Sequence, residues 1–152
     1  MGKTINQVSV FLENSPGQLS DVLGILKNNN VDIFALNISE TENYGVMRII
    51  VQDPKSASSF LNEAGYVTSL SQVYLIGVPN VLGGLKGFVD DISKNGINID
   101  YMYSMVDTGN NGMAYMIIAV NDFVKMNKFL EEKNILTGDS VMSILVNNDS
   151  VN

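Results

Sequence analysis

The chain has 152 residues, of which 45% are hydrophobic and 16% charged, a balance typical of a folded globular protein rather than a disordered one. It has no cysteine and no histidine, which excludes a disulfide framework and a Cys/His zinc site, and we expect no metal and no cofactor. The formal net charge of −7 disfavours binding to nucleic acid or to an anionic membrane, so small molecules and other proteins remain as partners.

The chain opens with a strand and a helix. Val8, Val10 and Leu12 alternate with polar residues, which is the pattern of a half-buried strand. After a Pro/Gly turn, apolar residues recur at the i, i+3, i+4 and i+7 spacing of one helix face. These residues are Leu19, Val22, Leu23 and Leu26. The asparagines at 28–30 end the predicted helix.

Two further strands are expected over residues 31–39 and 46–52. Asp53-Pro54 then opens a second helix, which Gly65 ends. Its predicted inward residues are Phe60, Leu61 and Ala64. The run 67–78 has no strong turn signal, so we expect one strand that passes from the first half of the chain into the second without a linker.

The second half of the chain repeats the first. The turn at 14–19 aligns with 80–85, and the strand and helix on either side of it follow without a gap. A longer turn at 107–112 then adds residues to the second copy, so that Ile49 and Ile50 align with Ile117 and Ile118.

Each copy predicts the order β-α-β-β-α-β, the split βαβ or ferredoxin-like arrangement. The expected fold class is α/β (α+β), with two ferredoxin-like βαββαβ units in tandem, each an antiparallel sheet with helices on one face. The expected units are 1–70 and 71–146, followed by a polar tail at 147–152.

Short motifs in both copies resemble an ACT domain. The first copy has Asn-x-Pro-Gly-x-Leu at 14–19 and Asn-Asn-Val-Asp-Ile at 29–33. The second copy has a similar signature, Lys-Asn-Gly-Ile-Asn-Ile, at 94–99. The resemblance is to small stand-alone tandem ACT proteins without a catalytic domain, and it implies a regulatory protein that binds an amino acid between its units.

The resemblance also implies which residues contact the ligand. They are Asn14, Gly17, Gln18, Leu19 and Asp32 in the first copy, and Asn80, Gly83, Gly84, Leu85 and Asn98 in the second. Leu82 replaces the proline of the motif in the second copy, and Asp32 stands where the family often has asparagine in the first. Either change can leave only one of the two sites competent to bind ligand.

The chemistry of these residue types suits an amino acid independently of the family. Unpaired N–H groups at a helix N-terminus bind a carboxylate, and glycine lets a ligand approach the backbone closely. Asparagine side chains serve either end of the ligand, and Asp32 can pair with its ammonium group. Tyr101 and Tyr103, at period two, are expected either to wall the pocket or to pack in a core or dimer interface.

Structural alternatives remain open for the turns. Gly17 and Gly83 are equally explained as turn glycines, and Asn14 and Asn80 as helix caps. A functional alternative is a ligand-free module for protein interaction or oligomerisation.

An enzyme is the less favoured alternative, because the commonest general base and the best nucleophile are absent. We expect a homodimer and, as a further partner, an unidentified regulated enzyme. We also expect a cytoplasmic location, because the start of the chain is polar and no apolar run is long enough to span a membrane.

Overall fold

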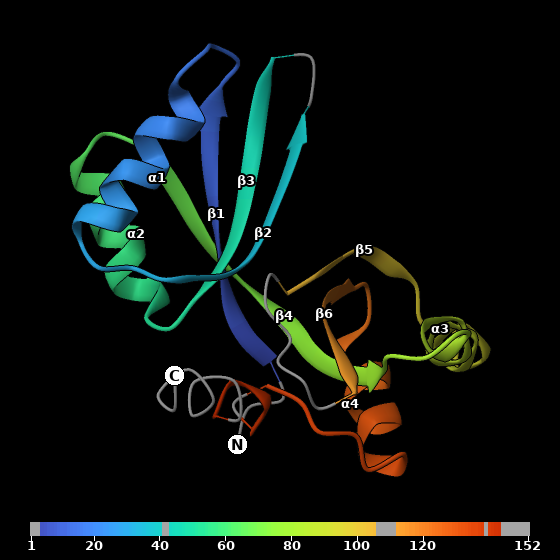
Figure 1. Cartoon of the computed structure of the whole chain (residues 1–152). Coiled ribbons are helices and arrows are strands. Elements are labelled where there is room, and N and C mark those ends of the chain that lie inside the picture. Colours follow the sequence, from blue (N-terminus) through green and yellow to red (C-terminus); the bar gives the residue numbers. More distant parts are fainter. Residues whose placement is uncertain (1–3, 41–42, 106–111, 139, 144–152) are drawn as a thin grey trace. The chain divides into compact units, whose positions relative to one another are not determined.

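The computed structural model describes residues 4–40, 43–105, 112–138 and 140–143. Contacts divide the chain into two compact units. The N-terminal unit is Asn6–Ser71, and the C-terminal unit comprises Gln72–Asn152 with Met1–Ile5. Figure 1 shows the helices and strands along the chain. The predicted polar tail at 147–152 and the turn residues 107–111 lie outside the described residues.

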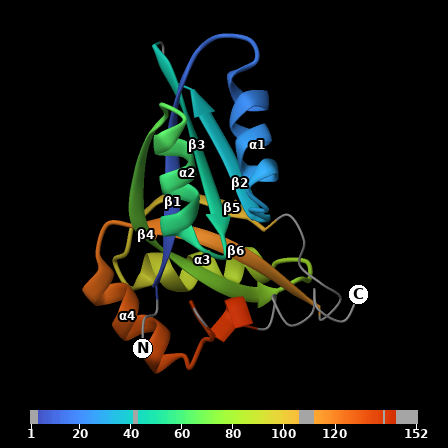
Figure 2. The same ribbon diagram turned by 90° about the vertical axis from the view of Figure 1, so that its left-hand side faces the viewer.

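The N-terminal unit has two helices on one face of an antiparallel sheet. Its elements are β1 (Thr4–Glu13), α1 (Gln18–Asn28), β2 (Ile33–Glu40), β3 (Tyr44–Val51), α2 (Pro54–Glu63) and the first part of β4 (Val67–Pro79). The strand order is β2-β3-β1-β4. Both α1 and α2 lie on the viewer's side of this sheet in Figure 2.

The core of the N-terminal unit follows the predicted periodicities. Alternate residues of β1 and β3 meet the buried stripes of the two helices in one cluster. Its members are Val8, Val10, Leu12, Val22, Leu26, Met47, Ile49, Val51, Ala57 and Leu61. The prediction for Leu61 is confirmed, but Ala64 is exposed, because α2 ends there and Ala57, one turn before Leu61, takes the inward position.

The C-terminal unit repeats this arrangement. Its elements are the second part of β4, α3 (Gly84–Lys94), β5 (Ile99–Ser104), β6 (Met113–Val120) and α4 (Phe123–Glu132). The strand order is β4-β6-β5. Ile92 of α3 and Met126, Phe129 and Leu130 of α4 pack in one cluster with alternate residues of β4 and β6. The predicted fold class, ferredoxin-like units with antiparallel strands, is confirmed.

β4 is one unbroken strand of 13 residues, Val67–Pro79, as the absence of a turn signal predicted. Its first residues, to Ser71, belong to the N-terminal unit, and the rest, from Gln72, belong to the C-terminal unit. The chain therefore passes between the units without a linker.

The first helices of the two units, α1 and α3, begin and end in the same way. Gly17 and Gly83 precede α1 and α3 in the left-handed conformation, with φ of 92° and 80°. Asn29 and Asn95 end these helices, and each donates its side-chain Nδ2 to the carbonyl oxygen four residues earlier, at 2.8 and 2.7 Å. The alignment of 14–19 with 80–85 matches Gly17 with Gly83 and Asn29 with Asn95, so these shared features support the alignment over the turn and the helix.

The strand registers correct the alignment of the third strand. Leu36 lies opposite Ile49 in the N-terminal unit, and Met102 lies opposite Ile118 in the C-terminal unit. Ile118 therefore corresponds to Ile49 and not to Ile50, so the sequence alignment of this strand was shifted by one position. The additional residues of the second copy lie between Met102 and Ile118, where neighbouring isoleucines made the sequence alignment ambiguous.

The last predicted strand of the second copy is reduced to a single bridge among the described residues. Thr137 pairs with Ile76 of β4, and the N–H of Gly138 donates to the carbonyl oxygen of Leu75 at 3.1 Å. Gly138 has a φ of 59°, and residues 140–143 are helical. The chain turns at this glycine, so within the described residues the predicted last strand is limited to the bridge at Thr137, and residues 144–146 of the predicted unit lie outside them. Within the described residues, no helix has the length and apolarity that crossing a membrane requires.

Candidate functional site

The turn of the N-terminal unit presents an uncapped helix N-terminus. Gly17 is the N-cap of α1, and no described side chain caps the first turn. The interpretation of Asn14 as the cap is therefore wrong, since it lies three residues before Gly17. The N–H groups of Leu19 and Ser20 have no acceptor among the described residues. These donors are available to an acceptor from outside the chain.

The turn of the C-terminal unit is more tightly constrained. Gly83 is the N-cap of α3, so Asn80 is not the cap either. The N–H of Asn80 donates to the carbonyl oxygen of Gly112 at 2.9 Å, which ties the turn to the start of β6. A Cβ on Gly84 would lie 2.2 Å from the carbonyl oxygen of Pro79. Close backbone packing alone therefore explains the glycine at position 84.

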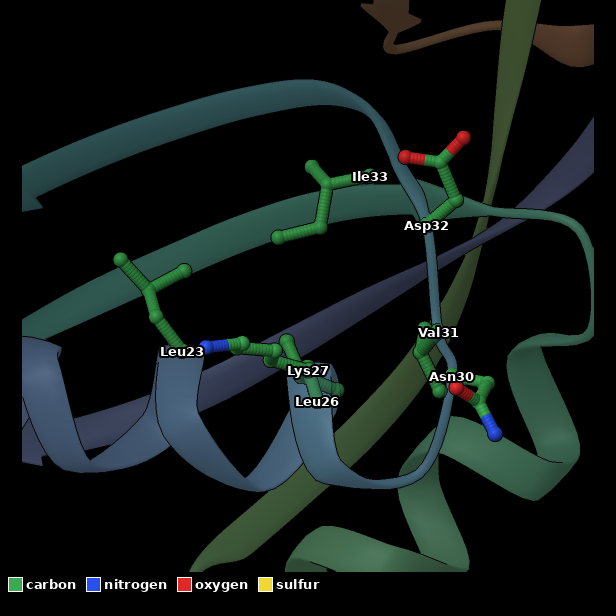
Figure 3. Close-up of a pocket in the computed structure, with 7 residues that line it drawn as sticks. All are labelled: Leu23, Leu26, Lys27, Asn30, Val31, Asp32 and Ile33. Atoms are coloured by element: carbon green, nitrogen blue, oxygen red, sulfur yellow. The ribbon is translucent and has the colours of Figure 1, made fainter.

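Asp32 lies at the opposite end of α1 from Gln18. The helix has 11 residues, about 16 Å of length, so Asp32 does not meet the turn within its own unit. It lines a separate groove of about 470 Å³ with Lys27 and Asn30, over an apolar floor. In Figure 3 the carboxylate of Asp32 points away from Lys27. The remaining lining residues are Leu23, Leu26, Val31 and Ile33.

The other predicted positions of the C-terminal unit differ in their surroundings. Asn98 donates its N–H to Oδ1 of Asn121 at 3.0 Å and accepts from the N–H of Asn121 at 3.2 Å. These bonds join the start of β5 to the end of β6. Tyr101 and Tyr103 lie on one face of β5, half-buried and buried, and both have interactions within the chain. Leu85 is 39% exposed, and its counterpart Leu19 is half-buried.

A cavity of about 400 Å³ lies at the turn end of the N-terminal unit. Of the twelve residues predicted to bind ligand, this cavity contains only Gln18. The sequence motifs did not indicate the other residues that line the cavity, although the alternation of β1 places Phe11 and Glu13 together on the face opposite the helices. The residues that line the cavity are Phe11, Leu12, Glu13, Gln18, Tyr44, Ala64, Gly65, Tyr66 and Val67.

Several polar groups of this cavity are unpartnered. The Glu13 carboxylate, the Gln18 amide and the Tyr66 hydroxyl have no hydrogen-bond or ion-pair partner among the described residues. The rings of Phe11 and Tyr44 form a tilted pair, with centroids 6.2 Å apart and an interplanar angle of 57°. The arrangement can therefore bind a small ligand through polar, charged and aromatic contacts.

The fold and the repeated turns define a tandem pair of ferredoxin-like units. The model of the ACT domain pair family matches residues 3–145. The chain belongs to this family, and the resemblance inferred from the motifs is confirmed.

Solved structures share the fold. Protein BT0572 from Bacteroides thetaiotaomicron is 33% identical, with a TM-score of 0.82 over 91% of this chain and 96% of that one. The ligand-free regulatory subunit of aspartate kinase from Thermus thermophilus is 12% identical, with a TM-score of 0.59 over 84% and 91% of the two chains, and shares the fold. No curated protein sequence was found to match the chain.

Proposed function

We propose that the chain is a non-catalytic regulatory protein that binds a small molecule, and that the ligand is an amino acid. Membership of the ACT domain pair family supports a small-molecule-binding regulatory role. The observation that carries the proposal is the cavity at the first turn of the N-terminal unit, whose volume of about 400 Å³ lies within the range of about 300–1,000 Å³ common for ligand sites.

The chemistry around the turn supports an amino acid. The uncapped first turn of α1 offers N–H groups of Leu19 and Ser20 that suit a carboxylate, with the favourable end of the helix dipole behind them. The turns at 14–19 and 80–85 remain the proposed contact points, and 1–70 and 71–146 the proposed ACT units. The cytoplasm remains the proposed location.

Protein interaction is a second candidate function, favoured by the surface of the C-terminal turn. Val81 is 67% exposed and Leu82 is fully exposed. Adjacent exposed apolar side chains are typical of an interaction surface. We propose that this turn contributes to a homodimer contact. Sedimentation of the wild-type chain should show a dimer, and Leu82→Asp should shift it toward the monomer; a dimer unaffected by this change would contradict the assignment.

A thermal-shift screen against the proteinogenic amino acids tests the ligand proposal. A ligand at one hundred times its Kd stabilises the folded state by about 2.7 kcal/mol, which raises the Tm of a chain of this size by about 5 °C or more. Gln18→Ala should reduce the shift, whereas Gln52→Ala, an exposed glutamine outside the cavity, should not. The absence of any shift at millimolar concentrations would contradict an amino acid ligand.

A further inference from the structure

We infer that the cavity of the N-terminal unit binds an alkylammonium group, the cationic end of a free amine or of a lysine side chain, and that the C-terminal unit lacks this site. The inference rests on the proposed ligand-binding function and goes beyond it, because it names the chemical group that the cavity takes and the residues that hold it.

Three side chains of the cavity share one face of the sheet. Glu13 lies opposite Tyr44 in the register of β1 and β3, and Phe11 precedes Glu13 by two residues on the same face. Directly opposed residues in such a pair have Cβ atoms about 5 Å apart. The register therefore places the Glu13 carboxylate beside the Phe11–Tyr44 ring pair.

This combination favours a cation. Among the described residues that line the cavity, only Glu13 is charged, so no lining side chain neutralises its carboxylate. Both rings are accessible, since Phe11 is 40% and Tyr44 45% exposed. A cation within about 6 Å of an aromatic ring is attracted to its face, and a carboxylate strengthens the site by direct pairing.

The negative charge of Glu13 favours an alkylammonium group over the α-ammonium group of an amino acid. The α-ammonium is separated from its own carboxylate by a single carbon, and Glu13 would repel that carboxylate. An ammonium at the end of an apolar stem brings no anion with it. The apolar parts of the lining, including Leu12 and Val67, suit such a stem.

The C-terminal unit has lost each of these determinants. Its register pairs Gly77 with Tyr115 and Pro79 with Met113, so glycine replaces Phe11, proline replaces Glu13, and Met113 replaces Tyr44.

Tyr115 also fills the space that an aromatic residue on the first strand would need. A Cβ on Gly77 would lie 3.1 Å from Cε1 of the Tyr115 ring and 3.2 Å from Cε of Met113. The site is therefore a property of one unit, although the fold is repeated.

Isothermal titration of the full chain with L-lysine, cadaverine and L-norleucine tests the inference. Lysine and cadaverine carry the alkylammonium group, and norleucine replaces the terminal ammonium of lysine by a methyl group. We expect lysine or cadaverine to bind at about one per chain and at least tenfold more tightly than norleucine. Glu13→Gln should weaken this binding about tenfold, and Tyr44→Leu should weaken it to a smaller degree.

Glu132→Gln is the matched control, because it removes the same charge from an exposed position of the C-terminal unit. It should leave binding unchanged. The Tm of each variant, measured without ligand, verifies that it folds.

The outcomes separate this inference from the proposed function. Norleucine binding as tightly as lysine, with no effect of Glu13→Gln, would overturn the alkylammonium site and leave an amino acid ligand in place. Binding of cadaverine that depends on Glu13, with no amino acid bound, would support the site and contradict the amino acid ligand. Failure of both lysine and cadaverine to bind at millimolar concentration overturns the inference.

Discussion

Gly84 shows at the scale of a single residue how closely the backbone packs in the C-terminal turn. A Cβ at this position would overlap the carbonyl oxygen of Pro79. We predict that Gly84→Ala lowers the free energy of unfolding by about 2 kcal/mol or more, because the backbone must move. Gly87, in the same helix, has nothing within 4 Å of its added Cβ.

Gly87→Ala is therefore the control, and should raise the free energy of unfolding by about 0.5–1 kcal/mol, since alanine has the higher helix propensity. Urea unfolding measures both changes. Equal effects of the two substitutions would contradict the close approach at Gly84.

The buried hydroxyl of Tyr74 makes the stability of the C-terminal unit depend on pH. Its hydroxyl donates to Oδ1 of Asn127 at 2.6 Å, and the side chain is buried in the core of the C-terminal unit. Burial, with a smaller contribution from the negative charge of Asp122, raises the pKa of Tyr74 to about 12 from its ordinary value of about 10. The folded state therefore favours the protonated hydroxyl.

This contribution to stability is fully present below about pH 10 and is lost as the pH rises toward 12. Tyr74→Phe should lower the free energy of unfolding by about 1 kcal/mol at pH 7, through loss of the hydrogen bond. The difference between wild type and variant should shrink above about pH 10. Urea titrations at pH 7, 9 and 11 measure it, and a difference that stays constant would count against the raised pKa.

The sequence identified the two turns but not the side chains around the cavity. Gly17 and Gly83 could be recognised because the helical spacing of the apolar residues after each glycine shows where the helix begins. Phe11, Glu13 and Tyr44 come together only through the register of β1 and β3, which the periodicity of either strand does not specify. Asn14 and Asn80 were ambiguous between ligand contact and helix cap, and the structure removes only the second role.

At the scale of elements, the second helix of each unit begins with an aspartate cap. Asp53 accepts from the N–H of Ser56 at 3.1 Å, and Asp122 accepts from the N–H of Lys125 at 3.0 Å. We predict that Asp53→Ala and Asp122→Ala each lower the free energy of unfolding, because each removes the acceptor for an N–H group of the first helical turn. Asp90→Ala, which removes an exposed ion pair within α3, should change it by less than about 0.5 kcal/mol.

The Asp53 cap should also depend on pH. Hydrogen bonds from the hydroxyl and N–H of Ser56 hold the pKa of Asp53 below its ordinary value. Its contribution is therefore present above about pH 4 and lost as the pH falls through the lowered pKa of the folded state. Unfolding free energies at pH 7 and pH 3 should show the effect of Asp53→Ala decreasing in acid. An effect that is larger at pH 3 would contradict the cap.

Most elements could be predicted because their periodicities are strong. α1 and α3 show a clear helical face, and β4 shows neither proline nor glycine until Gly77. The last strand of the C-terminal unit was inferred from the repeat and not from its own residues. Gly138 has a positive φ that lets the chain turn away from β4 directly after Thr137. A comparison of apolar positions between the two copies does not detect such a turn.

At the scale of the whole molecule, duplication has preserved the fold and changed the chemistry of its two copies. Helix starts, helix ends and strand registers recur at matched positions of the two copies. The charged and aromatic residues that line the cavity at one turn are replaced at the other, where Gly77 is paired with Tyr115 and Pro79 with Met113. Ligand binding by such a protein should therefore be asymmetric between its units.

Isothermal titration of the full chain with each proteinogenic amino acid tests the proposed function directly. We expect a saturable heat from at least one amino acid, with about one molecule bound per chain and with binding weakened by Gln18→Ala in the cavity. No heat from any amino acid at millimolar concentration, with a protein that unfolds cooperatively, would contradict the claim that the chain is an amino-acid-binding regulatory protein.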